Sequence, residues 1–315
     1  MQENRDAEIE AALNSGALYY EERNYDYLFL KCKLEQAIQS VSPSNKALVI
    51  GSSHTKCGIL EDPFVNTTNL SIDSQDLYYD FALSRAVLER ETVKTTALFI
   101  GMGYYIAFHD LSMAKMNRDF LISPVYYPLL HDAHHWENPT IWDFWGMDIS
   151  EEVKKICESM AYLKMKQRRN YYENGMVRNS PVLPEGDWWK LSEEEKDHLG
   201  AVRGEAHGRL FKWKDTFSEN KEIFRDYIHY LSLRNILPVV LVTPFTAAYL
   251  NHLNPEMIDC FYELLGSAQE DVHVVDCNQS DLRGLFEESD FKDPDHLNQI
   301  GAQKLSCLLA GEFSL

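Results

Sequence analysis

The chain has 315 residues, of which 45% are hydrophobic and 25% are charged, so it is long enough to bury a sizeable core. It carries 30 Lys and Arg residues against 49 Asp and Glu residues, a formal net charge of −19. Nucleic acid and anionic membrane surfaces attract positively charged patches, so this balance argues against both as partners. No stretch of 18 consecutive apolar residues is present, so we also expect no membrane span.

The predicted elements begin with a helical segment over residues 1–41, in which Leu30, Leu34 and Ile38 recur at helical spacing. Its polar, acidic start lacks the basic and apolar regions of a secretion signal, so we expect a cytoplasmic protein. Strands buried on both faces of a sheet read as continuous apolar runs. Four such runs follow along the chain, at residues 47–50, 97–100, 239–242 and 272–275.

The alternation of these runs with helical segments predicts an α/β fold. Helices between buried strands are typical of a parallel sheet covered on both faces, so we expect a three-layer α/β/α sandwich with five parallel strands. The second and third runs are separated by far more residues than one crossover needs. We therefore assign residues 45–105 and 236–315 to the α/β core and residues 106–235 to a large, mainly helical insertion.

Several helix boundaries are marked in the second half of the chain. Ser192 and Glu195 form a predicted capping box at a helix start within the insertion. Asn254 is a predicted N-cap, because Pro255 follows it at the first helical position. A last helix is expected over roughly residues 299–309.

Two short polar motifs follow predicted strands. Gly51-Ser52-Ser53-His54 comes directly after the first run, and Asp293 precedes His296 by three residues in a loop after the last run. Ligands of an open parallel sheet bind outside the carboxyl ends of its strands. A serine nucleophile needs a base that takes its proton and a third group that orients the base. The motifs therefore predict Ser53 as nucleophile, His296 as base and Asp293 as orienting acid.

These motifs resemble those of the SGNH (GDSL-like) hydrolase superfamily. Its first block, Gly-x-Ser, is matched by residues 51–53, and its last block, Asp-x-x-His, by residues 293–296. The resemblance covers roughly residues 45–105 and 236–312 and implies a flavodoxin-like three-layer fold with acyl-hydrolase or acyltransferase activity. The Gly-Ser-Ser-His variant and the His-Leu-Asn-x-x-Gly-Ala ending are closer to one branch of the superfamily. That branch includes the D-alanine transfer protein of teichoic acids and the acetyltransferases of alginate.

The resemblance also implies where an oxyanion would be bound. The backbone N–H of Ser53 is one implied donor. Residues 69–74 are similar to the middle block of the family, with Ser74 where a glycine N–H usually helps. The third block, Gly-x-Asn-Asp, is replaced by a segment with Gly103 in place of the asparagine. We expect a backbone N–H near Gly103 or the hydroxyl of Tyr104 to substitute, because losing one donor typically costs about 10²–10³ in rate.

Neighbouring residues compete for these roles. Ser52 is an alternative nucleophile, but its spacing from Gly51 favours Ser53. An adjacent residue cannot easily reach back to the Ser53 hydroxyl, so we expect His54 to line the pocket or to cap the following helix. We expect Asp295 to be a solvated turn residue rather than the orienting acid.

Further aromatic and histidine residues are predicted to line the substrate pocket, namely Tyr105, His109 and Trp136. The tryptophans concentrate in residues 106–235, which makes the insertion the expected specificity element. Residues 131–135 include two histidines three apart and an aspartate, a set that can bind zinc on a helix. No second ligand cluster with a defined spacing accompanies them, so we expect no metal. No Gly-rich phosphate loop is present, and we expect no cofactor.

The sequence therefore predicts a serine-dependent acyl hydrolase, an esterase that works through a seryl ester on an acylated carbohydrate or a small ester. A polysaccharide O-acyltransferase that uses an acyl donor is the first alternative. The second is an SGNH-like module that is catalytically inactive and binds a glycan or a protein. With an ordinary histidine as base, activity should rise near pH 6–7. The oligomeric state is not indicated.

Overall fold

The computed structural model describes residues 26–39 apart from 28 and 32, residues 46–137 apart from 93, and residues 188–313. The chain forms two compact units, one of residues 1–35 and 111–175, the other of residues 36–110 and 176–315. Of the residues that we assigned to the insertion, the described residues 188–235 belong to the same unit as the sheet. Residues 138–187 of that insertion lie outside the described part of the chain.

Most of the described part of the first unit is helical. The N-terminal segment forms helix at residues 26–38 apart from 28 and 32. The segment 111–130 then folds into short consecutive helices: η2 (Leu111–Met113), α4 (Lys115–Asn117), the π-helix η3 (Arg118–Tyr126) and α5 (Tyr127–Leu130). Pro124 lies inside η3, and because proline has no N–H to donate, regular i→i−4 bonding is interrupted there.

The second unit contains a five-stranded parallel sheet in the order β2-β1-β3-β4-β5. This is the flavodoxin-like order, and it confirms the predicted fold class. The strands are β1 (Lys46–Gly51), β2 (Thr67–Asn69), β3 (Thr95–Gly101), β4 (Leu237–Val242) and β5 (His273–Asp276). The four apolar runs lie in or overlap β1, β3, β4 and β5. The short polar strand β2 carried no such run.

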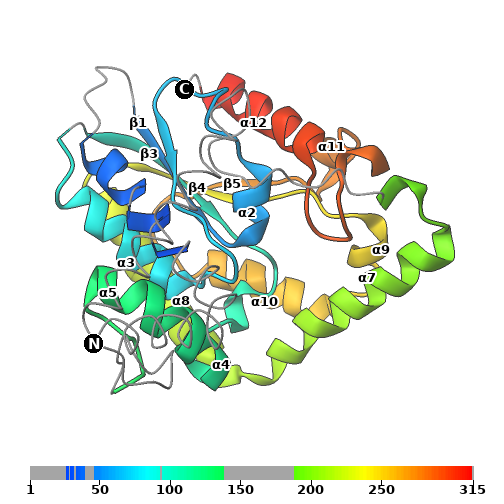
Figure 1. Ribbon diagram of the computed structural model, residues 1–315, viewed down its shortest axis with the longest axis horizontal. Coiled ribbons are helices and arrows are strands. Elements are labelled where there is room, and N and C mark those ends of the chain that lie inside the picture. Colours follow the sequence, from blue (N-terminus) through cyan, green and yellow to red (C-terminus); the bar gives the residue numbers. More distant parts are fainter. Residues whose placement is uncertain are drawn as a thin grey trace, which may run out of the picture. The chain divides into compact units, whose positions relative to one another are not determined.

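Helices cover both faces of this sheet (Figure 1). On one face α2 (Ser53–Gly58) packs against α12 (Gln299–Phe313), and Leu305 and Leu309 of α12 join a buried cluster with Val49 and Phe99 of the strands. On the other face α3 (Leu77–Leu88) and α10 (Pro255–Leu265) both contact α8 (Lys214–Ser232). The predicted three-layer sandwich is therefore confirmed.

The predicted helix starts agree with the structure. The capping box of Ser192 and Glu195 is present at the start of α7 (Glu193–Gly208). Asn254 caps α10 by accepting the N–H of Glu256. Helix α12 begins at Gln299 as expected and continues to Phe313, beyond the predicted end. Among the described residues, no helix combines the length and the apolar character that crossing a membrane requires.

Helix α7 lies directly against the short helix α9 (Ala247–Leu250), as Figure 1 shows. Two glycines make this close approach possible. A Cβ added to Gly200 would lie 2.4 Å from the carbonyl oxygen of Ala248, and one added to Gly204 would lie 2.8 Å from that of His252. Glycine within a helix lowers stability by about 1 kcal/mol relative to alanine. The close packing against α9 explains why glycine nevertheless occupies both positions. The contact fixes the position of α7 beside the carboxyl edge of the sheet.

The remaining short helices connect these layers. They are η1 (Ile106–Phe108), η4 (Trp188–Lys190), η5 (Arg209–Lys212), α11 (Ser280–Arg283) and η6 (Glu288–Asp290). The loop around η1 matters most, because it leaves the carboxyl end of β3. The carboxamide of Asn220 on α8 donates hydrogen bonds to the carbonyl oxygens of Ile106, Ala107 and His109 and holds this loop in place.

Candidate active site

Ser53 lies where β1 turns into α2, at the point where the sheet order reverses between β1 and β3. The turn requires glycine at position 51, where φ is +149°. A Cβ there would also lie 2.6 Å from the carbonyl oxygen of Gly101 on the neighbouring strand. Ser52 is the N-cap residue of α2 and Ser53 its first residue. The sequence thus places the half-buried Ser53 hydroxyl at the edge where parallel sheets bind ligands.

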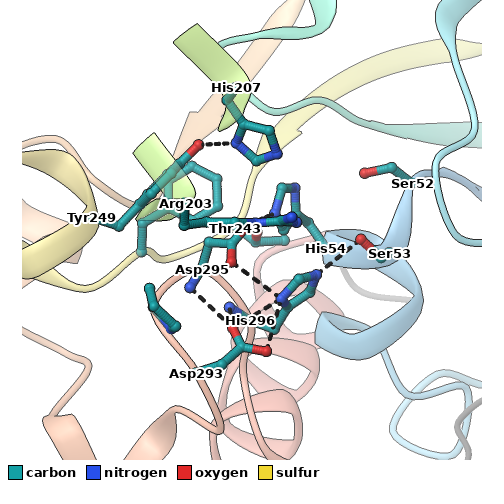
Figure 2. A network of polar contacts seen from close by, with 12 residues as sticks. Ser52, Ser53, His54, Arg203, His207, Thr243, Tyr249, Asp293, Asp295 and His296 are labelled. Atoms are coloured by element: carbon teal, nitrogen blue, oxygen red, sulfur yellow. Dashed lines mark hydrogen bonds and ion pairs between the residues drawn. The ribbon is translucent and has the colours of Figure 1, made fainter. Parts of the chain in front are cut away.

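The imidazole of His296 lies between Ser53 and Asp293 (Figure 2). Its Nε2 is 2.8 Å from the Ser53 Oγ, and its Nδ1 is 2.9 and 3.1 Å from the two carboxylate oxygens of Asp293. Asp293 Oδ1 also accepts the backbone N–H groups of Asp295 and His296, which shapes the loop so that the ring faces α2. With Nδ1–H bonded to Asp293, the neutral ring directs its Nε2 lone pair at the serine hydroxyl. This arrangement can remove the serine proton.

The expectation that Asp295 is a solvated turn residue is wrong. Its carboxylate is only 2% exposed, because α2 and α7 close over it. Asp295 Oδ2 accepts hydrogen bonds from Arg203 Nε on α7 at 2.8 Å and from His54 Nε2 on α2 at 2.7 Å. Its Oδ1 lies 3.3 Å from His296 Nδ1. A second carboxylate therefore stands beside the imidazole.

The two carboxylates change the protonation of His296. Burial alone would lower its pKa, but the charges and hydrogen bonds of Asp295 and Asp293 outweigh burial and raise the pKa to about 10. The pKa of Asp295 is held well below its usual range, since His296 and His54 stabilise the carboxylate against its own burial. At neutral pH the imidazolium form of His296 is favoured. Its free base form thus requires a higher pH than the ordinary range of 6–7.

His54 is a buried residue that contacts both His296 and Asp295. It is 2% exposed and its ring centroid is 4.7 Å from that of His296. Burial lowers its pKa, so the neutral ring donates its Nε2–H to Asp295. The expected pocket-lining role is corrected accordingly, because so deep a side chain offers substrate no surface. The expected capping role is also corrected, since Ser52 occupies the N-cap of α2.

Helix α7 contributes two site residues that sequence reasoning missed, Arg203 and His207. The His207 ring stacks on Tyr105 with centroids 4.0 Å apart and hydrogen bonds to the hydroxyl of Tyr249. Burial and the nearby Arg203 lower the pKa of His207 to about 2, so the ring is neutral. The sequence did carry a signal for this helix. Gly200 and Gly204 are four residues apart, as are Arg203 and His207. Two glycines at this spacing lie on one side of a helix and indicate that this side packs closely against another element.

The oxyanion side differs from the expectation at Tyr104. The Tyr104 hydroxyl donates its single proton to Asp276 at 2.8 Å, so it is not a spare donor for an oxyanion. At Gly103, an added Cβ would lie 2.6 Å from the ring of Tyr105. The Tyr105 ring thus occupies the place where an asparagine side chain at position 103 would begin. That is a physical reason for glycine here.

The loop with Ser74 is tied to the same region. Ser74 adopts a left-handed conformation with φ of 61°, and its carbonyl oxygen is 3.0 Å from Nε2 of the half-buried His109. Asn69 anchors the start of this loop by donating to the carbonyl oxygen of Ile59 and accepting the N–H of Ser71. The oxyanion role of the Ser74 N–H and the substrate-lining role of His109 stay predictions.

Tyr105, another predicted lining residue, lies beside Ser52. Its hydroxyl is 3.3 Å from Ser52 Oγ, and its ring is buried. Burial raises the pKa of Tyr105 to about 12, which keeps the hydroxyl protonated as a possible donor. Trp136 is half-buried and belongs to the other compact unit, so its lining role stays a prediction.

Three ligand-type side chains meet in the site, since suitable atoms of His54, Asp295 and His296 all lie within 4.8 Å of one another. Asp295 Oδ2 is already shared by an imidazole and the Arg203 guanidinium. A positive guanidinium on the same carboxylate opposes a second cation. We interpret this cluster as a hydrogen-bonded network rather than a metal centre.

No protein-family model matches the chain, and no curated protein matches its sequence. Among solved structures, the chain is similar to a protein from Streptococcus pneumonia described as "a putative platelet activating factor". The identity is 12% over 91% of this chain and 92% of that chain, with a TM-score of 0.39. A likeness at this level implies no shared activity, and the assignment of the chain to the flavodoxin-like α/β folds rests on its strand order.

Proposed function

We propose that this protein is a serine-dependent acyl hydrolase, an esterase that works through a seryl ester. The observation that carries the proposal is the 2.8 Å distance between Ser53 Oγ and His296 Nε2 at the carboxyl end of β1. A nucleophile and base within hydrogen-bond reach, with the base oriented by a third group, is the arrangement that activated serines require. Asp293 is the proposed third group.

The proposed reaction has two halves. Ser53 Oγ attacks the ester carbonyl carbon while neutral His296 takes its proton, and His296 then gives that proton to the leaving alcohol. A water molecule next attacks the acyl-serine, with His296 again taking a proton. Collapse of the second intermediate releases the acid and returns the proton to Ser53. Throughout, Asp293 accepts the Nδ1–H and stabilises the imidazolium.

The proposed oxyanion donors are the backbone N–H groups of Ser53 and Ser74 and a backbone N–H near Gly103. The first two follow the family resemblance, and the third replaces the side chain that Gly103 lacks. Donors aimed at a developing negative charge contribute several kcal/mol, roughly 3–4 each, to such reactions. Tyr104 is left out of this set because its hydroxyl is bound to Asp276.

The proposed substrate is an acylated carbohydrate or a small ester. Family resemblance favours the carbohydrate, and the polar aromatic surroundings agree with it. Tyr105 and His207 form a stacked, buried pair next to Ser52, and together with His54 they make the protein side of the site aromatic and polar. His109 and Trp136 remain proposed lining residues. No metal and no cofactor take part in the proposed reaction.

Labelling with a fluorophosphonate tests the proposal. The reagent forms a stable adduct with an activated serine, so the folded wild type should be labelled and Ser53→Ala should not. Ser52→Ala is the matched control and should retain labelling. Absence of labelling on the folded wild type would instead favour an inactive module that binds a glycan or a protein.

A second candidate is an O-acyltransferase that passes the acyl group to a sugar hydroxyl. The Gly-Ser-Ser-His motif favours it, through the branch of the family that it resembles. Product analysis separates the two reactions. With an acyl donor and a sugar acceptor, a transferase yields more acylated sugar than free acid, and a hydrolase yields the reverse.

A further inference from the structure

Asp295 joins three elements of the second unit behind the imidazole of His296. It comes from the loop that also holds Asp293, it accepts from His54 on α2, and it accepts from Arg203 on α7. Figure 2 shows the Arg203 side chain extending from α7 across the network above Asp295. Arg203 is thus the cation that binds the second carboxylate beside His296.

The groups around His296 differ in charge. From its own loop come the carboxylates of Asp293 and Asp295, and from α7 comes the guanidinium of Arg203. Asp73, in the loop after β2, is a further anion that interacts electrostatically with His296. Its side chain is 55% exposed, however, and forms an ion pair with Lys56. Burial keeps four further titratable neighbours of this network neutral: His54 on α2, His207 on α7, Tyr105 after β3 and Tyr249 on α9.

We propose that Arg203 is a positioning residue that sets the pH at which His296 becomes a base, by holding Asp295 from helix α7. This inference rests on the proposed function of Ser53 and His296, and it adds a third element to their control. Because α7 is docked against α9, the positive charge of Arg203 is held next to Asp295 and thereby affects the protonation of His296.

The physical reason is competition for one buried carboxylate. Asp295 has one oxygen 3.3 Å from His296 Nδ1 and the other 2.8 Å from Arg203 Nε. Interactions between charges this close are strong where water is excluded. While Arg203 neutralises part of the Asp295 charge, His296 holds its proton less tightly. Removing the guanidinium leaves the full charge of Asp295 acting on His296, whereas removing the Asp295 charge leaves Asp293 as the carboxylate that holds the His296 proton.

Histidine-selective NMR titration tests this inference without requiring turnover. Side-chain signals of labelled histidine are followed with pH, and His296→Asn assigns the signal of His296. Arg203→Met should raise the pKa of His296 by about one unit, a tenfold change in proton affinity, and Asp295→Asn should lower it. The double variant should titrate like Asp295→Asn, because Arg203 acts through Asp295.

Matched variants keep the result unambiguous. Arg209→Met removes an arginine that pairs with Glu205 on the exposed side and should leave His296 unchanged. Arg203→Lys keeps the charge and should restore most of the wild-type titration. If Arg203→Met does not fold, Arg203→Gln removes the charge but keeps a polar side chain and should give the same upward shift. No shift, or a downward shift, in the folded neutral variant would overturn the inference.

The pH dependence of kcat/KM for p-nitrophenyl acetate gives a second readout. Its rising limb should move upward in Arg203→Met and downward in Asp295→Asn. If the proposed function is wrong, turnover and labelling fail while the NMR titrations still shift. If only the inference about Arg203 is wrong, labelling still depends on Ser53, but the pKa of His296 is the same in Arg203→Met as in the wild type.

Discussion

Replacing Gly200 by alanine should lift α7 from α9 and destabilise the protein. The new Cβ would lie 2.4 Å from the carbonyl oxygen and 2.5 Å from the carbonyl carbon of Ala248. Both are backbone atoms, which cannot rotate aside as a side chain does. Alanine gains about 1 kcal/mol of helix propensity, but overpacking of this kind costs about 1–3 kcal/mol. With a clash this close the cost lies near the upper value, so the net loss should be roughly 1–2 kcal/mol.

Gly208 provides the control in the same helix. No heavy atom lies within 4 Å of a Cβ built there, so Gly208→Ala should be neutral or stabilising by up to about 1 kcal/mol. Thermal unfolding followed by circular dichroism gives the stabilities, and the rate of fluorophosphonate labelling gives the state of the site. Gly200→Ala should lower both, because Arg203 moves with α7. Equal or higher stability of Gly200→Ala than of Gly208→Ala would refute the packing explanation.

Three further substitutions test single features. Asp293→Asn should lower kcat by about 10⁴, because the imidazole would lose its orienting carboxylate; a loss below about tenfold in steady-state kinetics would point to Asp295 as the orienting acid. Tyr104→Phe should keep kcat/KM within about tenfold of the wild-type value, since the Tyr104 hydroxyl donates its proton to Asp276. A loss of about 10² or more would instead indicate that this hydroxyl binds the oxyanion. Burial raises the pKa of Asp80 well above its usual range. The protonated Asp80 side chain therefore contributes fully to the free energy of unfolding below about pH 4, and this contribution is lost as the pH rises toward the raised pKa. Asp80→Asn should flatten that dependence in urea unfolding between pH 5 and 8, and an unchanged slope would contradict the assignment.

Much of the fold could be predicted from the sequence, because strands buried on both faces leave a plain pattern. The run at residues 47–50 is apolar at every position since both sheet faces are covered. The strand β2 left no such pattern, because it is three residues long, polar and at the edge of the sheet. Its Thr-Thr-Asn sequence is ordinary for a loop, and only pairing with β1 makes it a strand.

The candidate site could be predicted only in part. Ser53 and His296 follow strand ends, so topology alone brings them to one edge, and the structure places them 2.8 Å apart. The surroundings of Asp295 could not be predicted, because its partners His54 and Arg203 come from α2 and α7, which are far apart in the sequence. Nothing local marks an aspartate that two distant elements will bury.

Mass spectrometry of the protein after reaction with a fluorophosphonate tests the central claim most directly. The account predicts one adduct on the folded protein, carried by Ser53 in fragment spectra of the peptide that contains both serines. It also predicts that Ser53→Ala carries none while Ser52→Ala carries the full adduct. An adduct on Ser52 alone, an adduct that persists in Ser53→Ala, or a folded wild type that never reacts would contradict it.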